Sequence, residues 1–496
     1  MINTDLLIVT VPVTDTGGKP LQAPAVLKGV AEKNGYSART MDLNHEFHKL
    51  SKTNKKEYDS LKNYFMLGTM LDIKDYKLVD RYIDKVANEV LEQFQPKYLA
   101  VSVFTYLCQK FSELFAQKIK DKNPKIKIIF GGMGLQSQGI KSDFEWPEKL
   151  KSANTIDHYI ASEGEVALVR LLKHGKGPGI DNPDWEQQKE LDSLVYPDYS
   201  DYDFNEYGTK TLMITGSRGC VRKCSFCDIH VHWKQFVFRS GRSIADEMIS
   251  QSQKYGIFRF QFTDSLINGS MKAYREFVEI MSDYNKNHPA KITWRGQMIV
   301  RGIRSMTKND WVLTRESGAV SFDIGIESGS ESVRDHMKKR FSNLDMDEFI
   351  EQAFINKVPC RLLLIVGYLN ETREDFQQTL NMLKKYKKYQ SMIPEVFPGT
   401  TMSILPGTTV WEDHKNDLSL NGGENFWTYA KNPTLDFRER LKRRIVLAEE
   451  CRKLGYKIDE ENGMKLMDFL WKIQIQKQQQ SITDIETNVL SDQKYS

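Results

Sequence analysis

The sequence has few cysteines, no long apolar run and almost no excess of either charge. Six cysteines among 496 residues, with no signal-peptide pattern at the N-terminus, predict a disulfide-free chain in the reducing cytoplasm. The longest apolar runs, residues 6–11 and 362–366, are far shorter than the roughly 20 residues that span a bilayer, so they predict buried strands. Lys and Arg number 70 against 66 Asp and Glu, a balance that indicates neither a nucleic-acid stripe nor a membrane surface.

Half of the cysteines are concentrated in one stretch. Cys220, Cys224 and Cys227 lie within eight residues, beside glycines that free the backbone to turn the sulfurs inward. Three thiolates can hold three irons of a four-iron cluster and leave the fourth iron open to a small chelating molecule. The same spacing also fits a zinc site with His230 or His232 as the fourth ligand. The spacing alone leaves both metals open.

With aromatic Phe226 before the last cysteine, the stretch resembles the cluster loop of the radical S-adenosylmethionine (SAM) enzymes. The resemblance implies a 4Fe–4S cluster on the three cysteines, with SAM chelated to the open iron and cleaved to a 5′-deoxyadenosyl radical. Phe226 then lies against the cofactor, and an electron donor such as flavodoxin or ferredoxin is a partner. Beside an anionic cluster, Arg218, Arg222 and Lys223 would offset its charge, whereas elsewhere they would be solvated surface charges.

The first 175 residues alternate between apolar runs and helical patterns. We expect strands at residues 5–12, 36–43, 98–104 and 126–130, and helices at 23–34, within 46–95 and at 111–120. This alternation predicts an α/β fold with a doubly wound parallel sheet, which binds ligands beyond the carboxyl ends of its strands. The loops at 13–20, 105–107, 131–135 and 162–165 then share one rim.

These loops resemble the cobalamin-binding domain that precedes the catalytic domain in one branch of radical SAM enzymes. The resemblance implies that the cofactor is bound by Gly131, Gly132, Glu163 and Gly164. An Asp-x-His-x-x-Gly pattern, which supplies a histidine to cobalt in other cobalamin proteins, is absent, because Asp42 and His45 have the wrong spacing. The resemblance therefore implies cobalamin with an open lower face, and a vestigial domain without corrin is the alternative.

A second α/β region follows a linker that is rich in Pro, Asp and Tyr. The predicted strands lie at residues 211–215, 258–263, 292–297, 320–326 and 361–366, with a sixth near 404–405. Helical patterns between them predict a partial (β/α)6 barrel with its site at the carboxyl ends of the strands. We divide the chain into a cobalamin-binding-like domain (1–180), a linker (181–207), a radical SAM core (208–410) and a mainly helical C-terminal region (411–496).

The C-terminal region matches the family least. An aromatic segment at residues 425–429 and a basic helix at 437–454 either cap the barrel mouth or belong to the core. Residues 474–496 are polar and rich in Gln, which predicts a disordered tail.

Four further residues fit SAM-binding positions of the family. Asp264 follows the second barrel strand and is a candidate for the amino group of SAM, or else a helix N-cap. Glu327 and Ser328, in a Gly-Ile-Glu-Ser-Gly segment after the fourth strand, are candidates for the ribose or the methionine end. Arg295 on the third strand is a candidate for the carboxylate, in a fork geometry, or a surface ion pair.

The resemblance as a whole implies a cytoplasmic, cobalamin-dependent radical SAM enzyme. Its expected reaction is methyl transfer to an unactivated carbon or to phosphorus of a small-molecule or peptide substrate, with no nucleic acid or membrane as partner. A radical rearrangement, ring formation or methylthio transfer on the same scaffold is one alternative. A non-enzymatic zinc-binding protein is the other.

Overall fold

The computed structural model describes residues 2–13, 18–67, 76–136, 144–161, 163–184, 187–397, 401–420 and 423–458. The chain divides into two compact units. Unit 1 comprises Met1–Cys220, Ile229–Arg295 and Glu316–Gly318, and unit 2 comprises Val221–Asp228, Gly296–Arg315 and Ala319–Ser496. The predicted tail at residues 474–496, Ser162 and part of the predicted loop at 13–20 lie outside the described residues.

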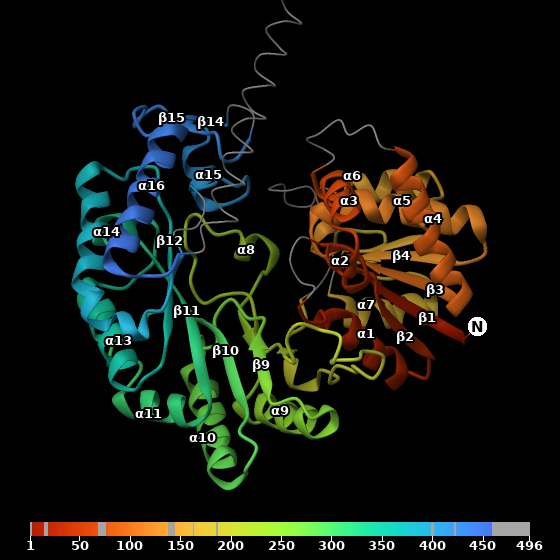
Figure 1. Cartoon of the computed structure of the whole chain (residues 1–496), viewed down its shortest axis with the longest axis horizontal. Coiled ribbons are helices and arrows are strands. Elements are labelled where there is room, and N and C mark those ends of the chain that lie inside the picture. The colour runs from red at the N-terminus through yellow and green to blue at the C-terminus, as the bar shows by residue number, and fades with distance from the viewer. Residues whose placement is uncertain are drawn as a thin grey trace, which may run out of the picture. The chain divides into compact units, whose positions relative to one another are not determined.

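The first sheet has five parallel strands in the order β2-β1-β3-β4-β5 (Figure 1). Its strands are β1 Ile2–Thr10, β2 Ala38–Asp42, β3 Phe94–Ser102, β4 Lys127–Gly131 and β5 His158–Ile160. The helices between and after them are α1 Gln22–Lys33, α2 Leu43–Thr53, α3 Lys55–Leu67, α4 Tyr76–Gln93, α5 Gln109–Lys122, α6 Glu145–Ser152 and α7 Gly164–His174, with short 3-10 helices η1 Tyr106–Cys108 and η2 Met133–Leu135. The predicted doubly wound sheet is confirmed, and β5 is a strand that the sequence patterns did not reveal.

Helices cover both faces of this sheet because its strands are apolar on both sides. Along β1, Leu7 and Val9 lie in one buried cluster with α2, α4 and α5, whereas Leu6 and Ile8 lie in another with α1 and α7. All four side chains are almost completely buried. Burial of each such side chain contributes about 1.5–3 kcal/mol, so the sheet is the centre of the first hydrophobic core.

The second sheet has six strands in the order β13-β12-β11-β10-β9-β6. Its strands are β6 Leu212–Ile214, β9 Arg259–Phe262, β10 Thr293–Met298, β11 Ala319–Glu327, β12 Cys360–Leu364 and β13 Val396–Phe397. The pairs β6–β9, β9–β10, β11–β12 and β12–β13 are parallel. The remaining elements are η3 Leu191–Ser193, β7 Ser217–Arg218, α8 Ile229–His232, β8 Val237–Phe238, α9 Gly241–Tyr255, α10 Met271–Asn287, α11 Lys308–Glu316, α12 Glu331–His336, α13 Asn343–Ile355, α14 Arg373–Tyr386, η4 Lys387–Met392, α15 Thr409–His414, β14 Leu418–Ser419, β15 Thr428–Tyr429 and α16 Phe437–Leu454.

The sixth strand does not lie where the sequence predicted it. The prediction near residues 404–405 is wrong, because β13 lies at Val396–Phe397 and pairs with β12. Ile404 instead donates its backbone N–H to the carbonyl of Glu424, at 2.9 Å, and packs in an apolar cluster with Trp427. Two apolar residues in a row do not distinguish a short strand from a buried loop.

Side chains alternate between two environments along the barrel strands of unit 1. Phe262 of β9 and Trp294 of β10 pack against Phe277 of α10, with ring centroids 5.6 and 5.2 Å from that ring. Because successive side chains of a strand point to opposite faces, Gln261 and Arg295 lie on the face away from the helix. We call this face of β9 and β10 the inner face.

The aromatic segment before α16 belongs to the core. Trp427 is fully buried, and the guanidinium of Arg440 lies 3.7 Å from the centroid of its ring. Arg440 donates to the backbone carbonyls of Trp427, Leu435 and Asn425, which ties α16 to this segment. In the part of the chain that the structure describes, no helix is both long and apolar enough to cross a bilayer.

Candidate functional site

The cysteine stretch begins in unit 1 on a loop that Asp264 anchors. Asp264 follows β9, and its carboxylate accepts hydrogen bonds from the Gly216 backbone N–H (2.9 Å) and the Ser217 hydroxyl (2.6 Å). Gly219 has a φ of +80°, and a Cβ there would lie 2.5 Å from the Gln235 carbonyl. Only glycine fits this left-handed turn without strain, so the backbone before Cys220 is closely defined.

Asp264 is therefore an anchor of the loop. Its alternative role as a helix N-cap is wrong, because Ser270 caps α10 and accepts a hydrogen bond from the Ala273 N–H. The side chain is buried, and this burial raises the pKa of Asp264 to about 7, against the opposing effect of its hydrogen bonds. A contact between this carboxyl and the amino group of SAM stays a prediction.

In unit 2 hydrogen bonds from Ser225 to three other segments hold the stretch in place. The Ser225 N–H donates to the Met337 carbonyl (3.0 Å), its hydroxyl bonds the Tyr368 hydroxyl (2.7 Å), and its carbonyl accepts from the Val410 N–H (2.8 Å). Phe226 packs against the apolar cluster of unit 2 that contains Tyr368. None of the six cysteines of the chain, the three in the stretch included, forms a disulfide.

A buried ion pair lies beside the second half of the stretch. Lys339 Nζ donates to Glu327 Oε1 at 2.9 Å, and their side chains are 9% and 11% exposed. Burial lowers the pKa of Lys339, but the charges of Glu327, Cys224 and Cys227 outweigh this effect and raise it. Lys339 therefore supplies positive charge next to two of the three thiols. The role of Lys339 could not be predicted from the sequence, since only its place in a basic run after α12 sets it apart.

Glu327 and Ser328, the predicted contacts of the ribose or the methionine end of SAM, both have hydrogen-bond partners in unit 2, and their contact with SAM stays a prediction. Glu327 ends β11 with a φ of +65°, next to an irregularity in the pairing of β11 with β12. Ser328 is fully buried, and its hydroxyl lies 3.3 Å from the Thr379 hydroxyl and accepts from the Ser330 N–H at 3.1 Å. Ser328 is therefore hydrogen-bonded within the fold. Glu327 has a strained backbone conformation and pairs with the ammonium of Lys339.

Arg218, just before the first cysteine, is bound to the rim of the first sheet. Its guanidinium pairs with the carboxylates of Glu163 and Glu165 through separate nitrogens. Burial raises the pKa of Glu163, and the charge of Arg218 opposes this effect. Neither role predicted for Arg218, offsetting the charge of a cluster or lying solvated at the surface, includes this contact, because nothing in the local sequence links positions 55 residues apart.

The rim of the first sheet holds a cavity of about 230 Å³. Its wall is mostly apolar, with polar groups near the cysteine stretch. The lining residues are Ile8, Gln22, Ala23, Val26, Leu27, Ala100, Val101, Ser102, Ile129, Gly131, Gly132, Ile160, Gly164, Glu165, Leu168, Thr215 and Arg218. Three of the four predicted cobalamin-binding residues line it, and Glu163 contacts it through Arg218.

Glycine is required in the wall of this cavity. Gly132 has a φ of +113°, and a Cβ there would collide with the Val103 carbonyl. A Cβ on Gly164 would lie 2.9 Å from the Leu27 side chain. Backbone therefore forms part of the cavity surface at the carboxyl ends of β4 and β5, where doubly wound sheets bind their ligands.

No histidine lies among the described residues that line the cavity. His48 is held on both ring nitrogens, by the Val13 carbonyl (3.1 Å) and the Tyr58 hydroxyl (3.0 Å). His158 bonds Asp181 at 2.8 Å. The cavity wall therefore offers no imidazole to a bound metal.

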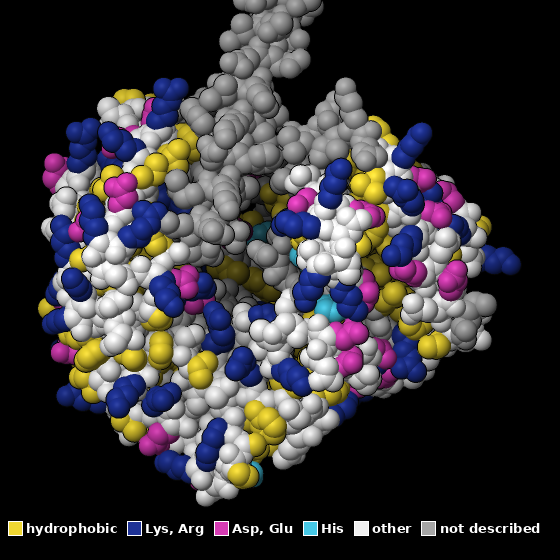
Figure 2. Space-filling view, in the orientation of Figure 1, with side chains coloured by type: hydrophobic (Ala, Val, Ile, Leu, Met, Phe, Trp, Pro, Cys, Tyr) yellow, Lys and Arg dark blue, Asp and Glu magenta, His cyan; other side chains and the backbone are white. Residues whose placement is uncertain are grey.

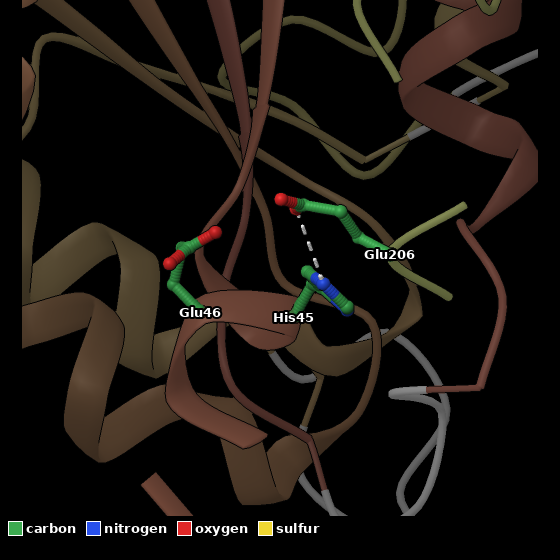
Figure 3. Close-up of side chains that lie close together, drawn as sticks. All are labelled: His45, Glu46 and Glu206. Carbon is green, nitrogen blue, oxygen red and sulfur yellow. Dashed lines mark ion pairs between the residues drawn. The ribbon is translucent and has the colours of Figure 1, made fainter. Parts of the chain in front are cut away.

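His45 lies in an ion-pair group with Glu46 and Glu206 (Figure 3). Its Nε2 is 3.7 Å from Glu206 Oε2, and the three ligand atoms of the group lie within 4.8 Å of one another. Lys49 donates to both carboxylates at 2.9 Å. Because this ammonium already supplies the charge that a cation would bring, we assign no metal to the group.

Charged side chains of both signs are interspersed over the face of the molecule shown in Figure 2. Single-sign stripes, which mark nucleic-acid surfaces, are not visible among the described residues of that face.

The comparisons with known sequences match the middle part of the chain. Residues 214–383 match the Radical SAM superfamily. The anaerobic magnesium-protoporphyrin IX monomethyl ester cyclase of Cereibacter sphaeroides is 23% identical over 342 residues, which cover 62% of this chain and 53% of that protein. The cytidylyl-2-hydroxyethylphosphonate methyltransferase of Streptomyces wedmorensis is 25% identical over 206 residues, which cover 38% of this chain and 37% of that protein. The chain spans little more than half the length of the cyclases that it matches, 53% and 58%.

Solved structures match over both halves. The radical SAM methyltransferase TsrM from Kitasatospora setae, solved with cobalamin and a 4Fe–4S cluster, is 13% identical with a TM-score of 0.59, covering 85% of this chain and 78% of that one. The cobalamin-dependent SAM radical enzyme OxsB, solved with aqua-cobalamin, is 14% identical with a TM-score of 0.60, covering 83% of this chain and 61% of that one. Residues 214–383 therefore resemble a radical SAM domain, and the fold of the chain is similar to the folds of these two solved structures.

Proposed function

We propose that this chain is a cobalamin-dependent radical SAM methyltransferase that acts on an unactivated carbon or a phosphorus centre. Its sequence places a segment similar to a radical SAM domain after a doubly wound sheet. One observation carries the proposal: Arg218 lines the cavity at the rim of the first sheet and lies two residues before Cys220. A corrin bound at that rim and a cluster bound by the cysteine stretch would then share one wall.

The residues of the cysteine stretch fit an iron–sulfur cluster. Cys220, Cys224 and Cys227 form no disulfide and lie on a loop whose backbone is fixed by Asp264 and Ser225. A cluster of this kind with its thiolates is anionic, and Lys339 provides the buried cation that stabilises such charge. We assign the three thiolates as cluster ligands and Phe226 as a neighbour of SAM.

The rim of the first sheet fits part of a corrin cofactor. Its cavity has a mostly apolar wall that would accept an apolar portion of the molecule. Gly131, Gly132 and Gly164 would let a planar ring approach the backbone, and the described residues of the wall include no histidine that could bind cobalt.

When bound, the two cofactors would supply reductive cleavage of SAM and a transferable methyl group, chemistry that no side chain provides. The chain's own residues position these groups. Asp264 fixes the loop, Lys339 holds Glu327 at the end of β11, and the inner face of β9 and β10 encloses the substrate. The partners that remain proposals are a small-molecule or peptide substrate and a reduced flavodoxin or ferredoxin.

A ring-forming reaction is the second candidate function. The cyclases of Cereibacter sphaeroides and Rubrivivax gelatinosus match over 62% of this chain, more than the phosphonate methyltransferase does. This similarity supports ring formation on the same scaffold, whereas the structural likeness to TsrM supports methyl transfer.

Corrin binding tests the proposal at the rim. Protein reconstituted without oxygen and incubated with hydroxocobalamin is expected to retain about one corrin per chain. Ala23→Phe, which places a bulky ring in the lining of the cavity, is expected to weaken corrin binding at least about tenfold, a cost of about 1.4 kcal/mol, without loss of iron. Ala153→Phe, exposed at the end of α6, is the matched control. Wild-type protein that retains no corrin contradicts the cobalamin assignment and leaves a cobalamin-free radical enzyme.

A further inference from the structure

Gln22 belongs both to the wall of the rim cavity and to a contact with the barrel strands of unit 1. It is the first residue of α1, and it lines the cavity together with Thr215. Its Oε1 accepts a hydrogen bond from the Thr215 hydroxyl at 2.8 Å. Thr215 follows β6 and directly precedes Gly216, whose backbone N–H donates to Asp264. The cavity is therefore tied to the residue at which the cysteine loop leaves the barrel.

A second hydroxyl continues this contact to the next strand. Thr215 Oγ1 lies 2.8 Å from the hydroxyl of Thr263, which follows β9. Thr263 Oγ1 also lies 3.3 Å from the Ile214 carbonyl, to which it can donate. All of these residues belong to unit 1. One chain of hydrogen bonds therefore runs from the rim cavity to the end of β9.

Each hydroxyl of this chain has one proton, so the direction of donation at one end fixes the direction at the other. Thr215 donates its proton to Gln22, so Thr263 must be the donor in the bond between the two threonines. Among the described residues, nothing then donates to the Thr263 oxygen, and nothing accepts from the Gln22 NH₂. The chain thus offers a donor to the cavity and an acceptor at the end of β9.

The opposite arrangement also satisfies the same side chains. Thr215 then donates to Thr263, and Thr263 donates to the Ile214 carbonyl. The Gln22 amide turns over, so that its NH₂ donates to Thr215 and its carbonyl faces the cavity. A ligand that distinguishes the two arrangements at one end of the chain changes their populations at the other end.

We propose that Gln22, Thr215 and Thr263 form a two-state hydrogen-bond relay through which the ligand of the rim cavity and SAM strengthen each other's binding. The inference rests on the proposed function, because it takes a corrin as the cavity ligand and the end of β9 as the site of the SAM amino group. An ammonium only donates, so it selects the arrangement in which the Thr263 oxygen is free. Carbonyl and phosphate oxygens of cobalamin accept from the Gln22 NH₂ in that same arrangement. The ligand that binds second therefore finds the relay already in the state that it needs.

The test measures whether SAM and a corrin change each other's affinity. Protein reconstituted with its cluster is kept oxidised, so that SAM binds without being cleaved. The Kd of hydroxocobalamin is measured by equilibrium dialysis with and without SAM. Wild type is expected to bind hydroxocobalamin about fivefold or more tightly when SAM is present. Hydroxocobalamin must then lower the Kd of SAM by the same factor, because coupling between two ligands is reciprocal.

Variants separate the relay from the shape of the cavity. Thr215→Val and Thr263→Val each remove one hydroxyl at similar shape, and each should make the two Kd values of hydroxocobalamin equal within about twofold. Thr263 is exposed, so Thr263→Val is expected to fold. Thr263→Ser keeps a hydroxyl and should keep the coupling. Val26→Ala removes two methyl groups from the cavity wall but no polar group, so it should raise both Kd values and leave their ratio as in wild type.

The outcomes distinguish the relay from the proposed function. If SAM leaves the Kd of hydroxocobalamin unchanged in wild type, or raises it, the relay is overturned and the cobalamin assignment stands. A ratio that stays as in wild type in either Val variant also overturns the relay alone. Wild-type protein that binds no hydroxocobalamin overturns both the cobalamin assignment and the relay.

Discussion

Lys339 Nζ lies 2.9 Å from Glu327 Oε1, and this buried pair fixes the residue at which β11 leaves the sheet. Glu327 has a φ of +65°, a conformation that residues other than glycine rarely adopt and that is often found at functional sites. The cation also lies near Cys224 and Cys227. One lysine therefore both stabilises a strained strand end and places positive charge beside two proposed cluster ligands.

A double-mutant cycle tests this pair. Glu327→Gln or Lys339→Met alone should lower the free energy of unfolding by about 3–5 kcal/mol, because each leaves a buried charge without its partner. The double variant should lose less than the sum, with a coupling of about 1–3 kcal/mol. Urea denaturation measures all four proteins. Additive losses would show that the two groups do not act together.

Arg218 should be required for the stability of unit 1. Arg218→Met leaves the carboxylates of Glu163 and Glu165 buried without a cation, which should cost about 3–5 kcal/mol in the free energy of unfolding.

Arg242, whose pair with Asp246 is long at 4.0 Å and exposed, supplies the control. Arg242→Met should change the free energy of unfolding by less than about 0.5 kcal/mol. Equal effects of the two substitutions in chemical denaturation would contradict a structural role for Arg218.

The anchor of the cysteine loop should titrate near neutral pH. Burial raises the pKa of Asp264 to about 7, above its value of about 3.9 in an unfolded chain. The protonated carboxyl therefore stabilises the fold at low pH, and this contribution is lost as the pH rises from about 4 to about 7, with a slope of up to about 1.4 kcal/mol per pH unit.

Asp264→Asn removes the titratable carboxyl, so the comparison with wild type separates the contribution of Asp264 from that of the other titratable groups. The difference in free energy of unfolding between wild type and Asp264→Asn, measured by urea denaturation from pH 5 to pH 8, should fall with pH and level off above about 7. A difference that is flat over this range would mean that the carboxyl is ionised throughout.

The sequence predicted what local patterns encode. The cysteine spacing identified the stretch that the Radical SAM superfamily match contains, and the basic helix at 437–454 has the bounds of α16. Four of the five strands of the first sheet were found within a few residues because both of their faces are buried and their apolar runs are continuous; the three-residue β5 was not. Their order was not predicted, since pairing depends on contacts between distant segments.

The partners of the site residues could not be predicted for the same reason. Arg218 meets Glu163 across 55 residues, and Lys19 meets Gln261 across 242. Asp264 was expected at a ligand or a helix end, but it anchors a loop 48 residues earlier. Charged residues carry no periodic signal of their own, so only the fold reveals which of them meet.

Cobalt bound at the rim of the first sheet should have no protein imidazole on its lower side. The described wall contains no histidine, and His48 and His158 already have hydrogen-bond partners. The paramagnetic resonance spectrum of the reduced cobalt form should therefore be the same in protein with natural-abundance histidine and in protein labelled with ¹⁵N-histidine. A change in nitrogen splitting on labelling would identify a histidine ligand.

The central claim is that the cysteine stretch holds a cluster that cleaves SAM, and reductive cleavage by reconstituted protein tests it most directly. Wild type, reconstituted without oxygen, should contain about four irons per chain and should form 5′-deoxyadenosine from SAM after reduction. The variant with Cys220→Ala, Cys224→Ala and Cys227→Ala should do neither, whereas Cys451→Ala, a buried thiol of α16, should do both. Wild-type protein that binds stoichiometric zinc, lacks iron and leaves SAM intact would contradict the account.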